Sequence, residues 1–138
     1  MKKITKKELK NLVYHVNGAA IEVHKTLGPG LLESVYHQCL AKELEIRDIK
    51  FTSECSIPLN YKGCALETKL RCDLLIEEVL VLELKSVAEI NPIYEAQLLT
   101  YMNLLKAPIG LLINFNVKNI FHEGQQTYVN DFYKKLPE

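Results

Sequence analysis

The sequence predicts a mixed α/β domain in which helices flank a mixed central sheet, and three patterns along its 138 residues support this prediction. An amphipathic helix runs from about Lys6 to Leu27. Two apolar stretches, at 66–76 and 79–87, have the composition of strands that are covered on both faces. A helix that begins at Asn91-Pro92 leads to a further buried strand at 109–115, which is the order expected of a parallel crossover.

Length and composition are those of an ordinary globular chain. With 48% hydrophobic and 25% charged residues, the chain is expected to form a single domain over residues 1–138. No segment approaches the roughly 20 apolar residues of a membrane helix, and the lysine-rich start does not resemble a signal peptide, so a cytoplasmic location is expected. Seventeen basic residues balance seventeen acidic ones, so the chain lacks the basic excess of a dedicated nucleic-acid binder.

The first helix is bounded by clear signals at both ends. Thr5-Lys6-Lys7-Glu8 has the form of a capping box, and Gly28-Pro29-Gly30 must end the helix because proline cannot continue the hydrogen-bond ladder. A second helix is expected to continue to about Arg47, with Glu33 in its first turn and on its inward stripe. A carboxylate there has a structural explanation as well, since it meets the positive end of the helix dipole.

The remaining strands are less sharply defined. Residues 51–61 alternate in part and form the first expected strand, in which Pro58 favours an edge or a bulge. Residues 118–122 and 127–129 are expected to add edge strands or a hairpin, and 133–138 a short helical or frayed tail. The four cysteines stand singly, without the Cys-x-x-Cys spacing of a thiol or zinc site, and are expected to be buried and reduced.

The register of the hairpin between the second and third strands decides whether its charged residues meet. A two-residue loop at Glu77-Glu78 would place Asp73 opposite Leu82. A three-residue loop at 77–79 would instead place Asp73 opposite Glu83, and only this register builds a site.

In that register two faces of the hairpin separate. One face carries Leu75, Val81, Asp73, Glu83 and Lys85, and the other carries Leu74, Ile76, Leu80, Leu82 and Leu84. Because both faces are largely apolar, the charged cluster is expected at the rim of a buried surface. The alternative, a salt bridge on a half-exposed sheet, is disfavoured by those apolar neighbours.

The helix that follows carries two further candidate residues. Gln97 and Tyr101 lie one turn apart on its surface, where Gln97 could equally form an ordinary surface hydrogen bond.

The order helix, helix, three strands, helix, strand, with carboxylates on the second and third strands, resembles the PD-(D/E)XK nuclease superfamily. It is most similar to the small bacterial and archaeal set called GxxExxY proteins. The resemblance covers roughly residues 8–130 and departs from the superfamily name at Cys72, where the name has proline. The matching segments are Gly30-Leu-Leu-Glu33-Ser-Val-Tyr36, Arg71-Cys72-Asp73-Leu74-Leu75, Glu83-Leu84-Lys85, Glu95-Ala96-Gln97-Leu98-Leu99-Thr100-Tyr101 and Gly110-Leu111-Leu112-Ile113-Asn114-Phe115.

The resemblance implies a restriction-endonuclease-like core and metal-assisted hydrolysis of DNA or RNA, with Mg²⁺ or Mn²⁺ as cofactor. Asp73 and Glu83 would bind the metal ion, because hard divalent cations take oxygen ligands and stabilise charge on a phosphate. Glu33 would join them directly or through water, and Lys85 would orient or help to deprotonate the attacking water. The residues expected to contact the lysine or the substrate are Gln97, Tyr101 and Tyr36.

Two other readings remain open at this stage. A nuclease fold can lose its activity and persist as a binding or assembly module. So small a domain could also form a homodimer or serve a larger complex.

A Glu-x-Lys triplet occurs three times in the chain, at 8–10, 67–69 and 83–85, so the triplet alone does not identify a site.

Overall fold

The computed structural model describes residues 4–138; residues 1–3, part of the lysine-rich start, lie outside the described residues. Two helices come first, α1 (Lys6–Leu27) and α2 (Glu33–Ile46), and α3 (Pro92–Leu105) and the short α4 (Asp131–Lys134) follow later. The strands are β1 (Phe51–Ser56), β2 (Leu59–Tyr61), β3 (Cys64–Leu66), β4 (Arg71–Ile76), β5 (Leu80–Lys85), β6 (Ile109–Asn114) and β7 (Gln125–Val129).

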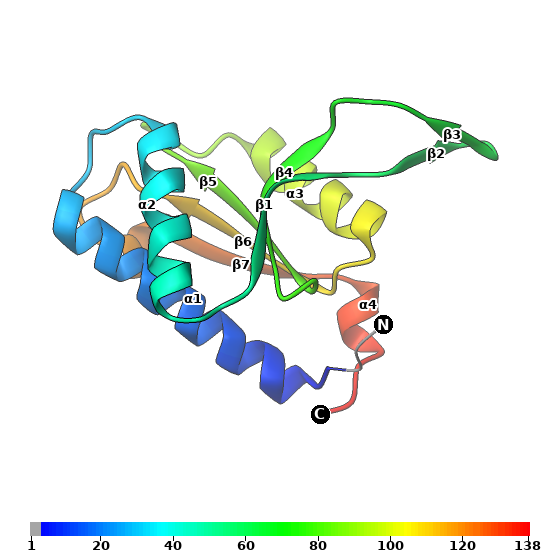
Figure 1. Cartoon of the computed structure of the whole chain (residues 1–138), viewed down its shortest axis with the longest axis horizontal. Coiled ribbons are helices and arrows are strands. Elements are labelled where there is room, and N and C mark those ends of the chain that lie inside the picture. The colour runs from blue at the N-terminus through cyan, green and yellow to red at the C-terminus, as the bar shows by residue number, and fades with distance from the viewer. Residues whose placement is uncertain (1–3) are drawn as a thin grey trace.

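Five strands form the central sheet in the order β1-β4-β5-β6-β7, and only β5 and β6 run parallel. Helices α1 and α2 cover one face and α3 the other (Figure 1). The predicted mixed sheet between helices, including the parallel crossover through α3, is therefore confirmed. None of the helices within residues 4–138 combines the length and the apolar character needed to cross a membrane.

The ends of α1 show why local sequence was informative here. The Thr5 hydroxyl accepts a hydrogen bond from the Glu8 amide, and the Glu8 carboxylate accepts one from the Thr5 amide, each at 3.1 Å. Gly28 ends the helix with a φ of 74°, a conformation that strongly favours glycine. The predicted capping box and both helix ends are confirmed.

The register that the site requires is also confirmed. Leu74 pairs with Leu82 and Ile76 with Leu80, which leaves a three-residue loop at 77–79. Glu77 and Glu78 both adopt positive φ, at 51° and 63°. The Glu77 carboxylate accepts the Lys50 amide at 3.0 Å, so the turn is tied to the segment that enters β1.

Two strand predictions were wrong for identifiable reasons. The expected strand at 51–61 is interrupted at Ile57-Pro58, because proline has no amide to donate to a ladder, and its second part forms a separate two-stranded sheet with β3. Residues 118–122 enter a single π-helical turn at Ile120–Gly124 rather than a strand. Gly124 permits that turn to approach the sheet, since a Cβ there would lie 2.3 Å from the Asn114 carbonyl oxygen.

The cysteines were only partly as expected. All four are free thiols, and Cys72 is buried, but Cys64 is exposed in the β2–β3 hairpin.

Candidate metal and catalytic site

Three carboxylates lie in one row across three neighbouring strands. The β1–β4 pairs on either side, Ser53 with Leu74 and Cys55 with Cys72, bring Glu54 opposite Asp73. On the other side of β4, Leu74 pairs with Leu82. Asp73 precedes Leu74 and Glu83 follows Leu82, so the antiparallel register places Asp73 and Glu83 opposite each other. The row Glu54, Asp73, Glu83 therefore joins an edge strand to the centre of the sheet.

Asp73 and Glu83 each bind the main chain of the other strand. The Asp73 amide donates to Glu83 Oε2 at 2.7 Å, and the Leu84 amide donates to Asp73 Oδ2 at 2.8 Å. Carboxylates thus take the place of main-chain carbonyls where the regular ladder ends, and such charge-assisted bonds hold the side chains firmly. One oxygen of each carboxylate is left for another ligand.

The surroundings of this pair oppose its ionisation. Glu83 is only 5% exposed. Burial, together with the nearby Asp73 carboxylate, raises the pKa of Glu83 to about 8. Burial likewise raises the pKa of Asp73. A bound divalent cation would favour the ionised carboxylates, since an opposite charge at short range lowers their pKa values.

Lys85 lies on β5 two residues after Glu83, and its side chain lies beside an aromatic ring. Its Nζ is 4.4 Å from the centroid of the Tyr94 ring, which comes from the first turn of α3. The face of an aromatic ring attracts a cation at this distance, so Tyr94 limits where the ammonium group can lie. Sequence reading missed Tyr94, although its spacing from Gln97 and Tyr101 places all three toward one side of the helix.

Glu33 reaches the site from the opposite layer. It begins α2 three residues before buried Tyr36 and lies on the predicted side of the helix, but its side chain is exposed. Partial burial raises the pKa of Glu33, while the charge of Lys85 opposes that shift. The Ser86 hydroxyl donates to the Leu31 carbonyl at 2.6 Å, which ties the loop before Glu33 to the end of β5.

Tyr36 holds that loop in place rather than facing a substrate. Its side chain is fully buried and stacks on Phe115 with ring centroids 4.4 Å apart. The Tyr36 hydroxyl donates to the Gly28 carbonyl at 2.5 Å and accepts from the Leu31 amide at 3.2 Å. The burial leaves Tyr36 no surface for a nucleic acid, which corrects the expectation of a substrate contact.

A histidine that sequence reading missed lies next to the carboxylate row. Donor atoms of His37, Glu54 and Asp73 all lie within 4.8 Å of one another, a spacing at which one metal ion could contact them. The Nδ1 atom of His37 is 3.8 Å from Glu54 Oε1, and Nε2 is 2.6 Å from the Ser53 hydroxyl. A partner on one ring nitrogen is the usual way in which a ligating histidine is oriented.

The signal for His37 was present in the sequence but weak. It follows Glu33 by four residues and so shares its side of α2. Glu54 gave no such signal, because its relation to Asp73 exists only through strand pairing.

With the geometry established, comparison with known proteins identifies the family. A family model described as the PD-(D/E)XK nuclease superfamily matches residues 10–127. The chain belongs to the PD-(D/E)XK nuclease superfamily. No curated protein and no solved structure gives a significant match to it.

The PD-(D/E)XK match covers every residue of the candidate site, and the fold brings most of them together. Asp73, Glu83 and Lys85 meet at the end of the β4–β5 hairpin, and the pKa of Glu33 responds to two of them. Gln97 is exposed on α3 and forms no hydrogen bond with Lys85 within residues 4–138. Tyr101 is 9% exposed, and burial followed by the Glu83 charge raises its pKa, so it lies near the acidic cluster.

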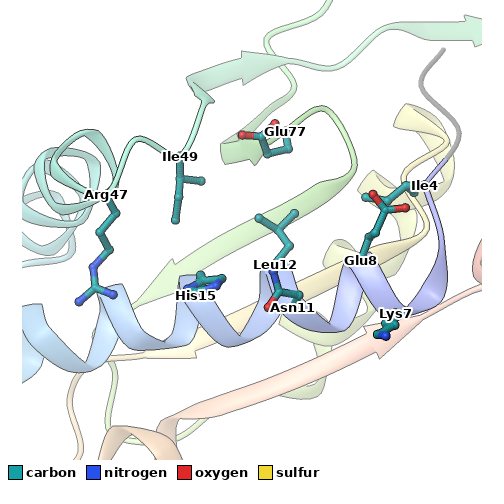
Figure 2. Close-up of a pocket in the computed structure, with 9 residues that line it drawn as sticks. All are labelled: Ile4, Lys7, Glu8, Asn11, Leu12, His15, Arg47, Ile49 and Glu77. Carbon is teal, nitrogen blue, oxygen red and sulfur yellow. The ribbon is translucent and has the colours of Figure 1, made fainter.

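A cavity of about 730 Å³ in this PD-(D/E)XK domain lies away from the candidate site. It lies between the first half of α1, the segment after α2 and the β4–β5 turn, at the other end of that hairpin from Lys85 (Figure 2). Its two carboxylates already have partners, since Glu8 caps α1 and Glu77 binds the Lys50 amide. We assign no catalytic role to this cavity.

Proposed function

We propose that this chain is a metal-dependent nuclease of the GxxExxY kind, which hydrolyses phosphodiester bonds in DNA or RNA. One observation carries the proposal: Asp73 and Glu83 are locked against each other's strand, with Lys85 two residues further along β5. Superfamily membership supports a nuclease-like activity on nucleic acid. The identity of the metal and of the substrate is part of the proposal.

Mg²⁺ or Mn²⁺ would be held by the free oxygens of Asp73 and Glu83, with Glu33 as a further ligand directly or through water. When bound, the cation supplies Lewis-acid stabilisation of the negative charge that builds up on the phosphate. Lys85 places its ammonium group where it orients the attacking water and stabilises the same charge. Tyr94 keeps that group in position, and Gln97 contacts the phosphate or the lysine from α3.

A cleavage assay tests the proposal directly. The protein is incubated with labelled single-stranded and double-stranded DNA and RNA, in Mg²⁺ or Mn²⁺, with a chelator as the control. Cleavage that requires the cation supports the nuclease. Binding of metal and nucleic acid without turnover would instead support the alternative of a silent binding or assembly module. The neutral net charge is compatible with that alternative.

His37 and Glu54 extend the same set of donors on the outer side of Asp73. We therefore expect His37→Ala to weaken Mn²⁺ binding by roughly tenfold, as is usual when one partner of a metal site is lost. Isothermal titration calorimetry in the absence of nucleic acid measures this. His15→Ala is the matched control, because His15 is an exposed histidine on α1. Unchanged affinity in His37→Ala would restrict the cation to Asp73, Glu83 and Glu33.

A further inference from the structure

The β2–β3 hairpin projects from the body of the domain (Figure 1). Its two three-residue strands form a sheet of their own, and all residues in them except Leu59 are exposed. An isolated two-stranded hairpin has little stability in water and buries almost no apolar surface. Core packing therefore does not explain why these residues form an ordered hairpin.

The base of the arm is fixed next to the carboxylate row. The chain enters the arm after β1, two residues beyond Glu54 at Ser56, and returns at Arg71, two residues before Asp73. At the base, the Ile57 amide donates to the Leu70 carbonyl at 2.9 Å. Ile57 is also 4% exposed and packs in the α3-side core, so the arm starts from a rigid position.

The tip of the arm presents an aromatic ring and a cation together. Lys62 and Gly63 form the turn with φ values of 50° and 86°, and Asn60 Oδ1 accepts the Gly63 amide at 2.9 Å. Lys62 Nζ lies 5.4 Å from the centroid of the Tyr61 ring, and Tyr61 is 60% exposed. An exposed ring beside a cation is suited to stack on a base and to bind the adjoining phosphate.

The charge of the arm is opposite to that of the site it adjoins. Residues 57–71 contain three basic residues, Lys62, Lys69 and Arg71, and one acidic residue, Glu67. All three basic side chains are exposed, and none of them forms a salt bridge within residues 4–138. The site itself gathers carboxylates that repel a polyanion, so a nearby basic surface would offset that repulsion.

We propose that the β2–β3 hairpin is a substrate arm that holds a single-stranded stretch of nucleic acid beside the carboxylate row. Tyr61 stacks on an unpaired base, and Lys62 and Arg71 contact phosphates. A single strand is favoured because in a duplex the base faces are already stacked on one another. The six residues from Ser56 to Tyr61 span roughly 16 Å when extended, enough to reach nucleotides beyond the one being cleaved. This inference rests on the proposed nuclease function and deepens it.

Strand binding by a Tyr61→Ala/Lys62→Ala double variant tests the arm. Both proteins carry Lys85→Ala, so that cleavage is slow during the measurement, and fluorescence anisotropy follows a labelled single-stranded oligonucleotide in Mg²⁺. We expect the double variant to bind at least tenfold more weakly, since stacking on one base alone is worth about this much. Lys10→Ala/Tyr14→Ala is the matched control, because both of its side chains are exposed on α1.

The outcomes distinguish a failure of the arm from a failure of the nuclease. With Lys85 intact, the double variant should raise KM and leave kcat unchanged, the pattern of lost uniform binding. Equal strand affinity in variant and parent, with cleavage intact in the natural sequence, would overturn the arm and leave the nuclease standing. Failure of the natural sequence to bind or cut any strand would overturn both. If the double variant loses a dimer that the parent forms in sedimentation, and its strand affinity is intact, the substrate arm is also overturned. The hairpin would then be a contact with a second copy of this chain.

Discussion

Lys85→Ala is expected to lower the rate of phosphodiester cleavage by about 10² to 10³-fold, the effect of removing one preorganised group that stabilises transition-state charge. The side chain comes from the end of β5, two residues after buried Glu83, and is held over the Tyr94 ring. Single-turnover cleavage with saturating metal measures the chemical step, and calorimetry with Mn²⁺ should show that metal binding survives. The variant should therefore lose rate without losing the cation.

Lys10→Ala is the matched control for this change. Lys10 belongs to the Glu8-x-Lys10 triplet, which repeats the Glu-x-Lys pattern on α1, where Glu8 and Lys10 are exposed. Its removal should leave the rate unchanged. If Lys85→Ala and Lys10→Ala cleave equally fast, the activity belongs to another site or to a contaminating nuclease.

The second large effect concerns the dependence of stability on pH. Glu83 has an ordinary pKa near 4.5 in the unfolded chain and about 8 in the folded protein, where burial and Asp73 disfavour its charge. Between these values the folded state binds more protons than the unfolded state, so the free energy of unfolding falls as pH rises. The contribution is fully present below about pH 4.5 and lost above about pH 8. We expect a loss on the order of 3 kcal/mol from this residue.

Urea unfolding in the presence of a chelator, at pH 5 and at pH 8, measures this loss. Glu83→Gln should remove most of the slope, because glutamine cannot ionise. Glu78→Gln, a neutral replacement of an exposed glutamate in the β4–β5 turn, should leave the slope as it is. A slope that persists in Glu83→Gln would assign the pH dependence to other carboxyl groups, such as Asp73 and Glu33, whose pKa values are also raised.

A divalent cation should oppose the loss of stability at high pH. Only ionised carboxylates bind the cation well, so added Mg²⁺ should raise the free energy of unfolding more at pH 8 than at pH 5. The same urea measurement, repeated with Mg²⁺ in place of the chelator, checks this. An equal increase at both pH values would place the bound cation away from Asp73 and Glu83.

Much of the fold followed from short-range patterns. The limits of α1 are set by its capping box and by Gly28, both local signals. Alternation reduced the β4–β5 register to a choice between a two-residue and a three-residue loop, and only the three-residue loop brings Asp73 and Glu83 to one face. That single inference placed Asp73 beside Glu83 correctly.

The errors arose where distant segments decide the outcome. Glu33 and Tyr36 share one side of α2, yet Tyr36 is buried against Phe115 and Glu33 is exposed, because the elements packed against the helix cover that side unevenly. The strand expected at 51–61 divides at Pro58, which has no amide for the ladder, and its two halves pair with different strands.

By itself the sequence determined that a carboxylate pair and a lysine would share one hairpin, because these residues lie within thirteen positions and alternation controls their faces. Only the tertiary structure decided what surrounds them. His37, Glu54 and Tyr94 come from a helix, an edge strand and a crossover helix, and their places depend on how those elements pack on the sheet. The projecting β2–β3 arm likewise became visible only when its residues were seen to pair with each other and not with the central sheet.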